Sequence, residues 1–159
     1  MKTDQITHES LHKLLIQFLR TTKKFNEFEK MSIDIGNDER LFPSEIHVIE
    51  AIGSKRANKV TELSYIFHIT KGAISQVVNK LQSKGFIHKE RNKDFGKEII
   101  LSLTPKGEDV FKIISKQHEL MAEEFINYLG NFKVEEIDYF VLILSKIEEY
   151  IDAFLKDEI

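Results

Sequence analysis

The chain has 159 residues, a formal net charge of −3 and no cysteine. Its length suits one compact domain or a domain with a helical extension, and its 42% hydrophobic residues are enough to form a core. The lack of cysteine excludes disulfides, thiolate metal ligands and thiol-based redox sensing. The polar N-terminus does not resemble a signal peptide, and no stretch approaches the length of an uncharged apolar membrane span, so we expect a cytoplasmic protein.

Positive charge is concentrated in the middle of the chain. Residues 55–97 carry a net charge of +7, whereas the remaining residues carry −10. Residues 70–86, TKGAISQVVNKLQSKGF, contain three lysines and no acidic residue. A basic segment in an acidic chain favours a polyanionic partner, although a lysine-rich solvated surface is the alternative.

The first half of the chain is predicted to be helical. Apolar residues recur every three or four positions over 6–31, which predicts a long helix that DIGNDERLF ends. Pro43 at a first turn and Gly53 at a terminus predict a second helix between them. Thr61 is predicted to cap a short third helix, which buries Leu63, Ile66 and Phe67.

The second half combines helices with a hairpin. Thr70 is predicted to cap a helix that Gly85 ends, and its inward residues are Ile74, Val77 or Val78, and Leu81. The segments FIHKER and KEIILSL, separated by NKDFG, predict a two-stranded hairpin with a basic tip. Thr104 and Pro105 begin a long helix, GNFK turns the chain, and a last helix follows.

We therefore predict a mostly α fold with a small β-hairpin, in which a winged helix-turn-helix is flanked by long dimerisation helices. The predicted parts are an N-terminal helix over 1–36, the winged helix-turn-helix over 37–104, and C-terminal helices over 105–159. The terminal helices carry more apolar surface than so small a central unit can cover. That surplus predicts contact with a second copy of the chain.

The outward face of the basic helix has the chemistry of DNA recognition. Asn and Gln can pair with adenine, and Lys can donate to the acceptors of guanine. Free N–H groups at the helix start favour a phosphate, and Gly72 removes a side chain where backbone approaches the duplex. The hairpin tip is placed to reach the sugar-phosphate backbone or the minor groove. The predicted DNA-binding residues are Thr70, Lys71, Gly72, Ser75, Gln76, Asn79, Lys80, Lys84, Arg91, Lys93 and Lys97.

Three segments, PSEIHVIEAI, VTELSYIFHITKGAISQVVNKLQSKGFI and ERNKDFGKEIILSLTPKG, resemble the MarR family of winged-helix bacterial transcription regulators. The resemblance implies a homodimer, built from the first and last helices, that acts on transcription, with repression the expected mode. It places two recognition helices in successive major grooves of a near-palindromic operator, about one helical turn apart. Family members usually carry Asp-x-Arg at the wing tip. Here Lys97 takes the basic position, Phe95 takes the aspartate position and Asp94 lies one residue early, which predicts a weaker wing contact.

The resemblance also implies a regulatory ligand. Family members commonly bind small aromatic or other apolar molecules in a crevice between the dimer helices and the DNA-binding unit. The candidate ligand-binding residues are His12, Phe18, Phe25, Phe28 and His47, although each phenylalanine has ordinary core packing as its alternative.

Two further kinds of regulation stay open. Some family members sense zinc, and His47 and His118 fall near two of the expected ligand positions; because the other ligands are not evident, no metal or cofactor is predicted. The segment EIHVIEAIG also resembles members that bind acylated carrier protein.

The sequence contains no Gly-rich phosphate loop, no G-x-S-x-G and no H-E-x-x-H, so we do not expect an enzyme. The remaining alternative is a winged-helix protein-interaction adaptor that has lost DNA binding. Such an adaptor would not need the basic and amide residues of the helix and wing, and their presence here favours DNA.

Overall fold

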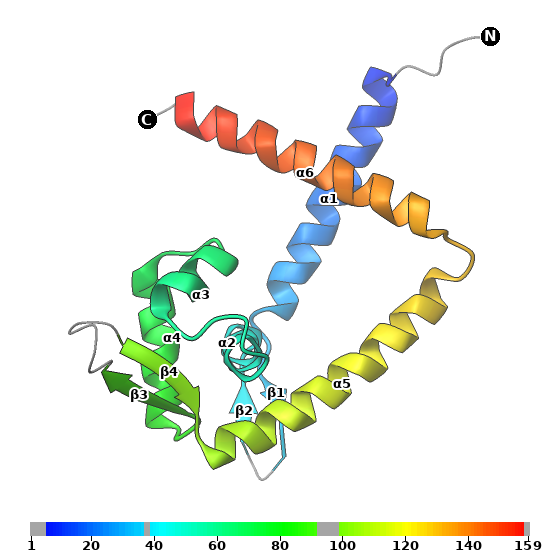
Figure 1. Cartoon of the computed structure of the whole chain (residues 1–159). Helices are drawn as coiled ribbons and strands as arrows, with labels where there is room; N and C mark the ends of the chain where they lie inside the picture. Colours follow the sequence, from blue (N-terminus) through cyan, green and yellow to red (C-terminus); the bar gives the residue numbers. More distant parts are fainter. Residues whose placement is uncertain (1–5, 37–38, 92–98, 158–159) are drawn as a thin grey trace. The chain divides into compact units, whose positions relative to one another are not determined.

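A computed structural model of the chain describes residues 6–36, 39–91 and 99–157. The elements in chain order are α1 (His8–Phe28), β1 (Ile33–Asp34), β2 (Arg40–Leu41), α2 (Pro43–Gly53), α3 (Val60–Ile66), α4 (Lys71–Ser83), β3 (Ile87–Arg91), β4 (Ile99–Leu103), α5 (Pro105–Leu129) and α6 (Val134–Asp157) (Figure 1). This mostly helical architecture with small hairpins confirms the predicted fold class. The chain divides into two compact units, Met1–Gln117 and His118–Ile159, and each is described on its own.

The first helix is shorter than its apolar pattern predicts. Thr7 caps α1, because its hydroxyl accepts from the Ser10 N–H at 3.1 Å while the Ser10 hydroxyl accepts from the Thr7 N–H at 3.0 Å. Ile6 and Met31 therefore lie outside the helix. After α1, β1 and β2 pair as an antiparallel ladder of two residues each, which the sequence did not predict.

The short helix α2 begins at Pro43, as predicted, and the Glu45 carboxylate accepts from the Phe42 N–H at 2.8 Å just before it. The prediction that Thr61 caps the third helix is wrong. Lys59 is the N-cap of α3, and Thr61 already lies inside the helix. The Glu62 carboxylate accepts from the Asn58 N–H at 3.0 Å, so an acid within the helix ties down the preceding turn in place of the expected threonine.

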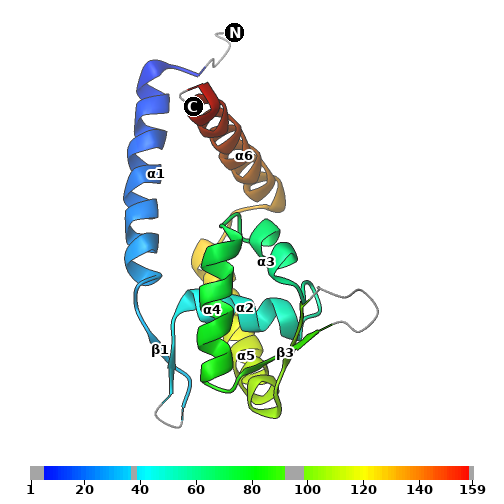
Figure 2. The same cartoon turned by 90° about the vertical axis from the view of Figure 1, so that its left-hand side faces the viewer.

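The turn between α3 and α4 is tight, with His68 in the left-handed region at φ 52°. Thr70 caps α4 as predicted, because its hydroxyl accepts from the Ala73 N–H at 3.2 Å. Ile74, Val78 and Leu81 are fully buried, whereas Val77 is half-buried, so Val78 takes the inward position. α4 therefore packs one face on the core and exposes the other. Figure 2 shows α4 in front of α2, on which it packs.

The predicted hairpin is present as β3 and β4, which pair antiparallel from Ile87 with Leu103 to Arg91 with Ile99. The loop after α2 is tied to it, since the Leu101 N–H donates to the Asn58 carbonyl at 2.8 Å. At the base of the hairpin, the Thr104 hydroxyl accepts from the Gly107 N–H at 3.0 Å and so caps α5, as predicted. One core joins these elements, and its fully buried members include Leu41, Ile49, Leu63, Ile74, Val78, Leu81 and Phe86.

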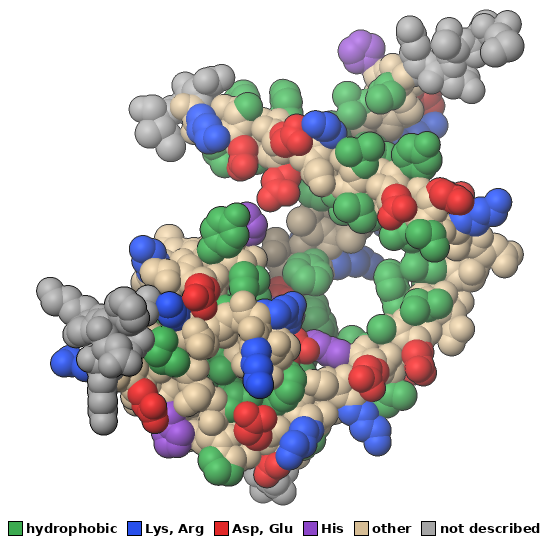
Figure 3. Space-filling view, in the orientation of Figure 1, with side chains coloured by type: hydrophobic (Ala, Val, Ile, Leu, Met, Phe, Trp, Pro, Cys, Tyr) green, Lys and Arg blue, Asp and Glu red, His purple; other side chains and the backbone are tan. Residues whose placement is uncertain are grey.

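The second unit holds the end of α5 and all of α6, with Gly130 at φ 64° in the turn between them. Its helices expose many large apolar side chains, which Figure 3 shows along α6. Among the described residues, no helix combines the length and apolar character that a membrane crossing requires. The exposed apolar residues of this unit include Leu120, Phe125, Ile126, Ile137, Phe140, Val141, Ile151 and Phe154.

Candidate nucleic-acid interface

The outward face of α4 presents polar side chains over three turns. Lys71, Gly72, Gln76 and Asn79 are exposed, as is Ser83 near the end of the helix. Ser75 is half-buried, and its hydroxyl donates to the Lys71 carbonyl at 2.7 Å. The face thus brings two amides and a lysine together on one side of a rigid element, as the sequence predicts.

The start of α4 offers backbone donors. The first N–H groups of a helix have no acceptor within the helix. Here the Ala73 N–H donates to the Thr70 hydroxyl, and among the described residues those of Lys71 and Gly72 have no acceptor. A Cβ added at Gly72 would meet only the Thr70 hydroxyl, at 3.8 Å. Packing within the chain therefore does not require glycine at this position. A glycine there is consistent with a partner molecule that approaches the backbone closely from outside.

Two of the predicted lysines are engaged inside the protein. Lys84 Nζ lies 2.7 Å from Oε1 of the buried Glu45, and Lys80 Nζ lies 3.4 Å from the same oxygen. Lys80 Nζ also lies 4.5 Å from the ring centroid of Phe42. The C-terminal end of α4 therefore directs its positive charge toward α2, which the sequence did not predict.

A contact between the wing and α4 was also missed. Lys89 on β3 donates from Nζ to Oδ1 of Asn79. Among the described residues the amide nitrogen of Asn79 has no hydrogen-bond partner, which suits donation to a base acceptor. The alternation of side chains along β3 predicts on which face of the hairpin Lys89 lies, but not what it contacts. The sequence therefore offered no signal for the contact between Lys89 and Asn79.

The wing is described up to Arg91, which is exposed and pairs with Ile99 at the outer end of the β3–β4 ladder. The other two predicted wing contacts, Lys93 and Lys97, lie outside the described residues, as do Asp94 and Phe95.

The predicted ligand-binding residues lie on α1 and α2. His12, Phe25 and Phe28 are exposed on α1 and Phe18 is half-buried there, with the rings of Phe25 and Phe28 6.4 Å apart. His47 on α2 lies 3.6 Å from the Glu29 carboxylate and 3.8 Å from that of Glu50.

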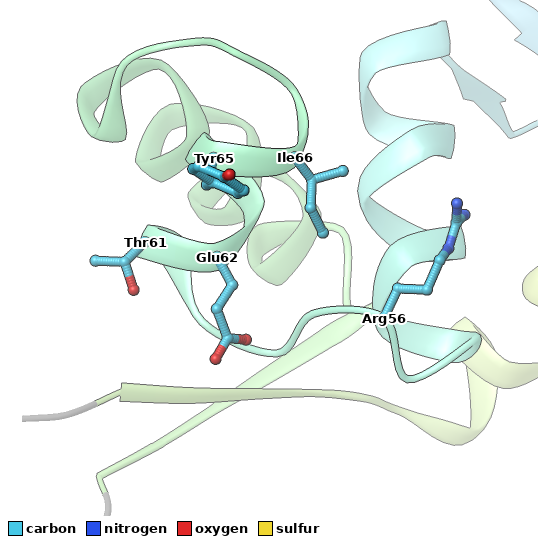
Figure 4. A pocket seen from close by; sticks show the side chains of 5 residues that line it. All are labelled: Arg56, Thr61, Glu62, Tyr65 and Ile66. Carbon is cyan, nitrogen blue, oxygen red and sulfur yellow. The ribbon is translucent and has the colours of Figure 1, made fainter.

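An open pocket of about 380 Å³ lies between α3 and the turn after α2 (Figure 4). None of the predicted ligand-binding residues lines it. The pocket is lined by Arg56, Thr61, Glu62, Tyr65 and Ile66. Charged, polar and apolar side chains therefore all contribute to its wall.

Zinc ligation finds no support in the described part of the chain. There, no group of three or more His, Asp or Glu side chains is placed to hold a metal ion. His47 has two carboxylates beside it at ion-pair distances, and His118 lies on α5 in the second unit.

Comparison with known proteins agrees with this geometry. Residues 41–99 match the model of the MarR family. The chain is 26% identical over 146 residues to the uncharacterized HTH-type transcriptional regulator YhjH of Bacillus subtilis (strain 168), covering 86% of this chain and 83% of that protein. It is 28% identical over 130 residues to the HTH-type transcriptional regulator BilQ of Clostridium symbiosum (strain WAL-14163), covering 82% of this chain and 83% of BilQ.

Solved structures show the same fold. Wild-type ZitR of Lactococcus lactis in complex with DNA matches with a TM-score of 0.67 at 22% identity, covering 89% of this chain and 98% of ZitR. The adhesin competence repressor AdcR of Streptococcus pyogenes matches with a TM-score of 0.65 at 15% identity, covering 89% of this chain and 98% of AdcR. Residues 41–99, which include the helix-turn-helix and β3, thus match the MarR family, and over most of its length the chain is similar to helix-turn-helix transcriptional regulators.

Proposed function

We propose that the protein binds a near-palindromic operator as a homodimer, represses transcription there, and is modulated by a small ligand. The observation that carries this proposal is the exposed polar face of α4, which stands beside the wing and holds Gln76 and Asn79 on a helix packed firmly on the core. The match of residues 41–99 to a family of transcriptional regulators gives no reason to assign an enzymatic activity.

In the proposed complex α4 enters the major groove. Gln76 and Asn79 contact base edges, while Thr70, Lys71, Gly72 and Ser75 bring the start of the helix to a phosphate. Arg91 and the more distal Lys93 and Lys97 approach the backbone or the minor groove. The similarly folded ZitR has been solved in complex with DNA, which supports DNA binding by a chain of this fold.

Removing a phosphate contact should change the salt dependence of binding. We expect Arg91→Ala and Lys71→Ala each to weaken binding to the operator and to random DNA alike. Each variant should also reduce the slope of log K against log salt by about 0.9, because one fewer counterion is released. Fluorescence anisotropy titrations on both duplexes at several salt concentrations measure this, and slopes equal to that of the wild type would exclude these two side chains from the interface.

The dimer proposal rests on the apolar side chains that the helices expose. Ile137, Phe140, Leu144, Ile147 and Ile151 recur at helical spacing along one side of α6, and Phe140 and Ile151 are 52% and 44% exposed. An exposed apolar stripe of this length is typical of a helix that packs on a partner. A second copy of the chain is the partner that a two-fold operator requires.

A charge in this stripe should weaken the dimer. We expect Ile151→Glu to raise the dimer dissociation constant at least about tenfold, because a carboxylate is costly to bury in an apolar interface. Ala153→Glu is the matched control, since it places the same charge about 200° around the helix. Sedimentation equilibrium measures both constants; equal effects of the two variants would contradict the assigned stripe.

Repression and effector response complete the proposal. A dimer seated on an operator blocks access to that DNA, and the similarly folded AdcR carries the name of a repressor. A ligand can release the dimer from the operator only if it binds more tightly to a dimer whose two recognition helices have a spacing that does not fit the operator. The candidate ligand contacts are His12, Phe18, Phe25 and Phe28 of α1 and His47 of α2; of these, Phe25 and Phe28 lie at the end of α1 that Glu29 joins to His47.

A further inference from the structure

A single buried carboxylate holds the C-terminal end of α4. Glu45 is 1% exposed, and both of its oxygens have partners. Oε2 accepts from the Phe42 N–H at 2.8 Å, while Oε1 lies 2.7 Å from Lys84 Nζ and 3.4 Å from Lys80 Nζ. A buried carboxylate needs such compensation, because an unpaired charge in the interior is strongly unfavourable.

Lys84 connects this carboxylate to further elements. Its Nζ donates to the Arg40 carbonyl of β2 at 3.2 Å, and its own carbonyl accepts from Lys106 Nζ at 3.0 Å. Lys106, near the start of α5, also forms an ion pair with Glu39. The end of α4 is therefore tied to β2, α2 and α5 through one lysine.

The opposite end of α4 is different. Lys71 is exposed and has no ion-pair partner among the residues that the structure describes. Lys71 is thus available to a polyanion, Lys84 neutralises the buried Glu45 directly at 2.7 Å, and Lys80 is exposed but shares the same carboxylate at 3.4 Å. The positions of Lys80 and Lys84 near the negative end of the helix dipole also favour this arrangement.

We propose that Glu45 is a positioning residue for DNA recognition, acting through Lys84. It fixes the far end of α4 against α2 and withdraws the charge of Lys84, and in part that of Lys80, from the DNA. Specific binding then depends on the base-contacting face of α4, while non-specific attraction at this end of the helix stays low. This inference rests on the proposed function, since it presumes that α4 meets DNA.

Glu45→Gln removes the charge and keeps the local cap, because a glutamine amide oxygen can still accept from the Phe42 N–H. The variant releases two lysines at the edge of the interface. We expect its binding to random DNA to tighten, with a salt slope steeper by about one to two units. The ratio of operator affinity to random-DNA affinity should fall about tenfold.

Two further lysine variants make the test independent of how well Glu45→Gln folds. Lys84→Met should lower operator affinity several-fold and leave the salt slope at the wild-type value. Lys71→Met, the same substitution at the exposed end of the same helix, should lower the slope by about 0.9. All variants are measured well below their unfolding temperatures by anisotropy on operator and random duplexes.

The outcomes separate the two claims. A salt slope that falls equally in Lys84→Met and Lys71→Met overturns the inference, because Lys84 then contacts DNA. Glu45→Gln with an unchanged slope and an unchanged affinity ratio overturns it as well, since the carboxylate then only stabilises the fold. A wild-type protein that binds no DNA contradicts the proposed function itself, and the inference falls with it.

Discussion

Replacing Gln76 by alanine is expected to weaken binding to the preferred operator by about 1–3 kcal/mol, a loss of roughly 5- to 150-fold. The side chain is exposed in the middle of the outward face of α4, on a helix whose opposite face is fully buried. Its amide can donate to and accept from one base, so its removal should cost affinity for one sequence and little for random DNA. Selection of bound sites from a random library measures the lost preference.

Gln82→Ala is the matched control for this variant. Gln82 is also exposed on α4, but it lies six positions closer to the C-terminal end, about 9 Å along the helix axis from Gln76. We expect it to leave the selected sequence unchanged. If both variants lost the same affinity on operator and random DNA, the assignment of the base-contacting face would be wrong. Asn79→Ala is a less direct probe, because it also releases Lys89.

Gly107→Ala is expected to destabilise the first unit by at least about 2 kcal/mol, the upper range for an overpacked site. A Cβ at this position would lie 2.2 Å from the Phe86 carbonyl oxygen and 3.2 Å from Leu103 Cβ. The first of these atoms is backbone, and it also accepts from the Thr104 N–H at 3.0 Å. The start of α5 cannot move away without breaking the join between helix and wing. Urea unfolding followed by circular dichroism measures the loss.

Gly72→Ala is the control, because the same methyl group meets only one atom within 4 Å there, at 3.8 Å. Alanine favours a helix over glycine, so this variant should be more stable than the wild type by up to about 1 kcal/mol. On the proposed docking it should nevertheless bind DNA more weakly, since the methyl group stands where backbone approaches a phosphate. A Gly107→Ala protein as stable as Gly72→Ala would contradict the close approach at the base of the wing.

Local sequence signals predict most of the fold. Pro43 and Gly53 bound α2, Thr70 caps α4, and Thr104 with Pro105 starts α5, because each residue acts through its own backbone or a neighbour within four positions. Alternation places the β3–β4 hairpin for the same reason. The outward face of α4 also follows from helical periodicity, once Ile74 and Leu81 are placed inward.

Features that depend on distant partners could not be predicted. The Lys84–Glu45 pair spans 39 positions, so the lysine looks in the sequence like any other cation on an exposed helix. β1 and β2 contain two residues each, too few for a periodic pattern. Thr61 has the right chemistry for a cap, but the chain turns helical earlier, at Val60. The Lys84–Glu45 pair is thus a long-range contact that no local pattern reports, whereas Thr61 lost its capping role to a local contact between Glu62 and Asn58.

The central claim is tested most directly by titrating the purified protein onto DNA from upstream of its own gene, against random competitor, near physiological salt. The account predicts saturable binding of two chains per site, at least about a thousandfold tighter than binding to random DNA. Footprinting should show two half-sites about one helical turn apart. Equal affinity for operator and random DNA, or no binding to either, would contradict the account and favour an adaptor that binds proteins through the same surface.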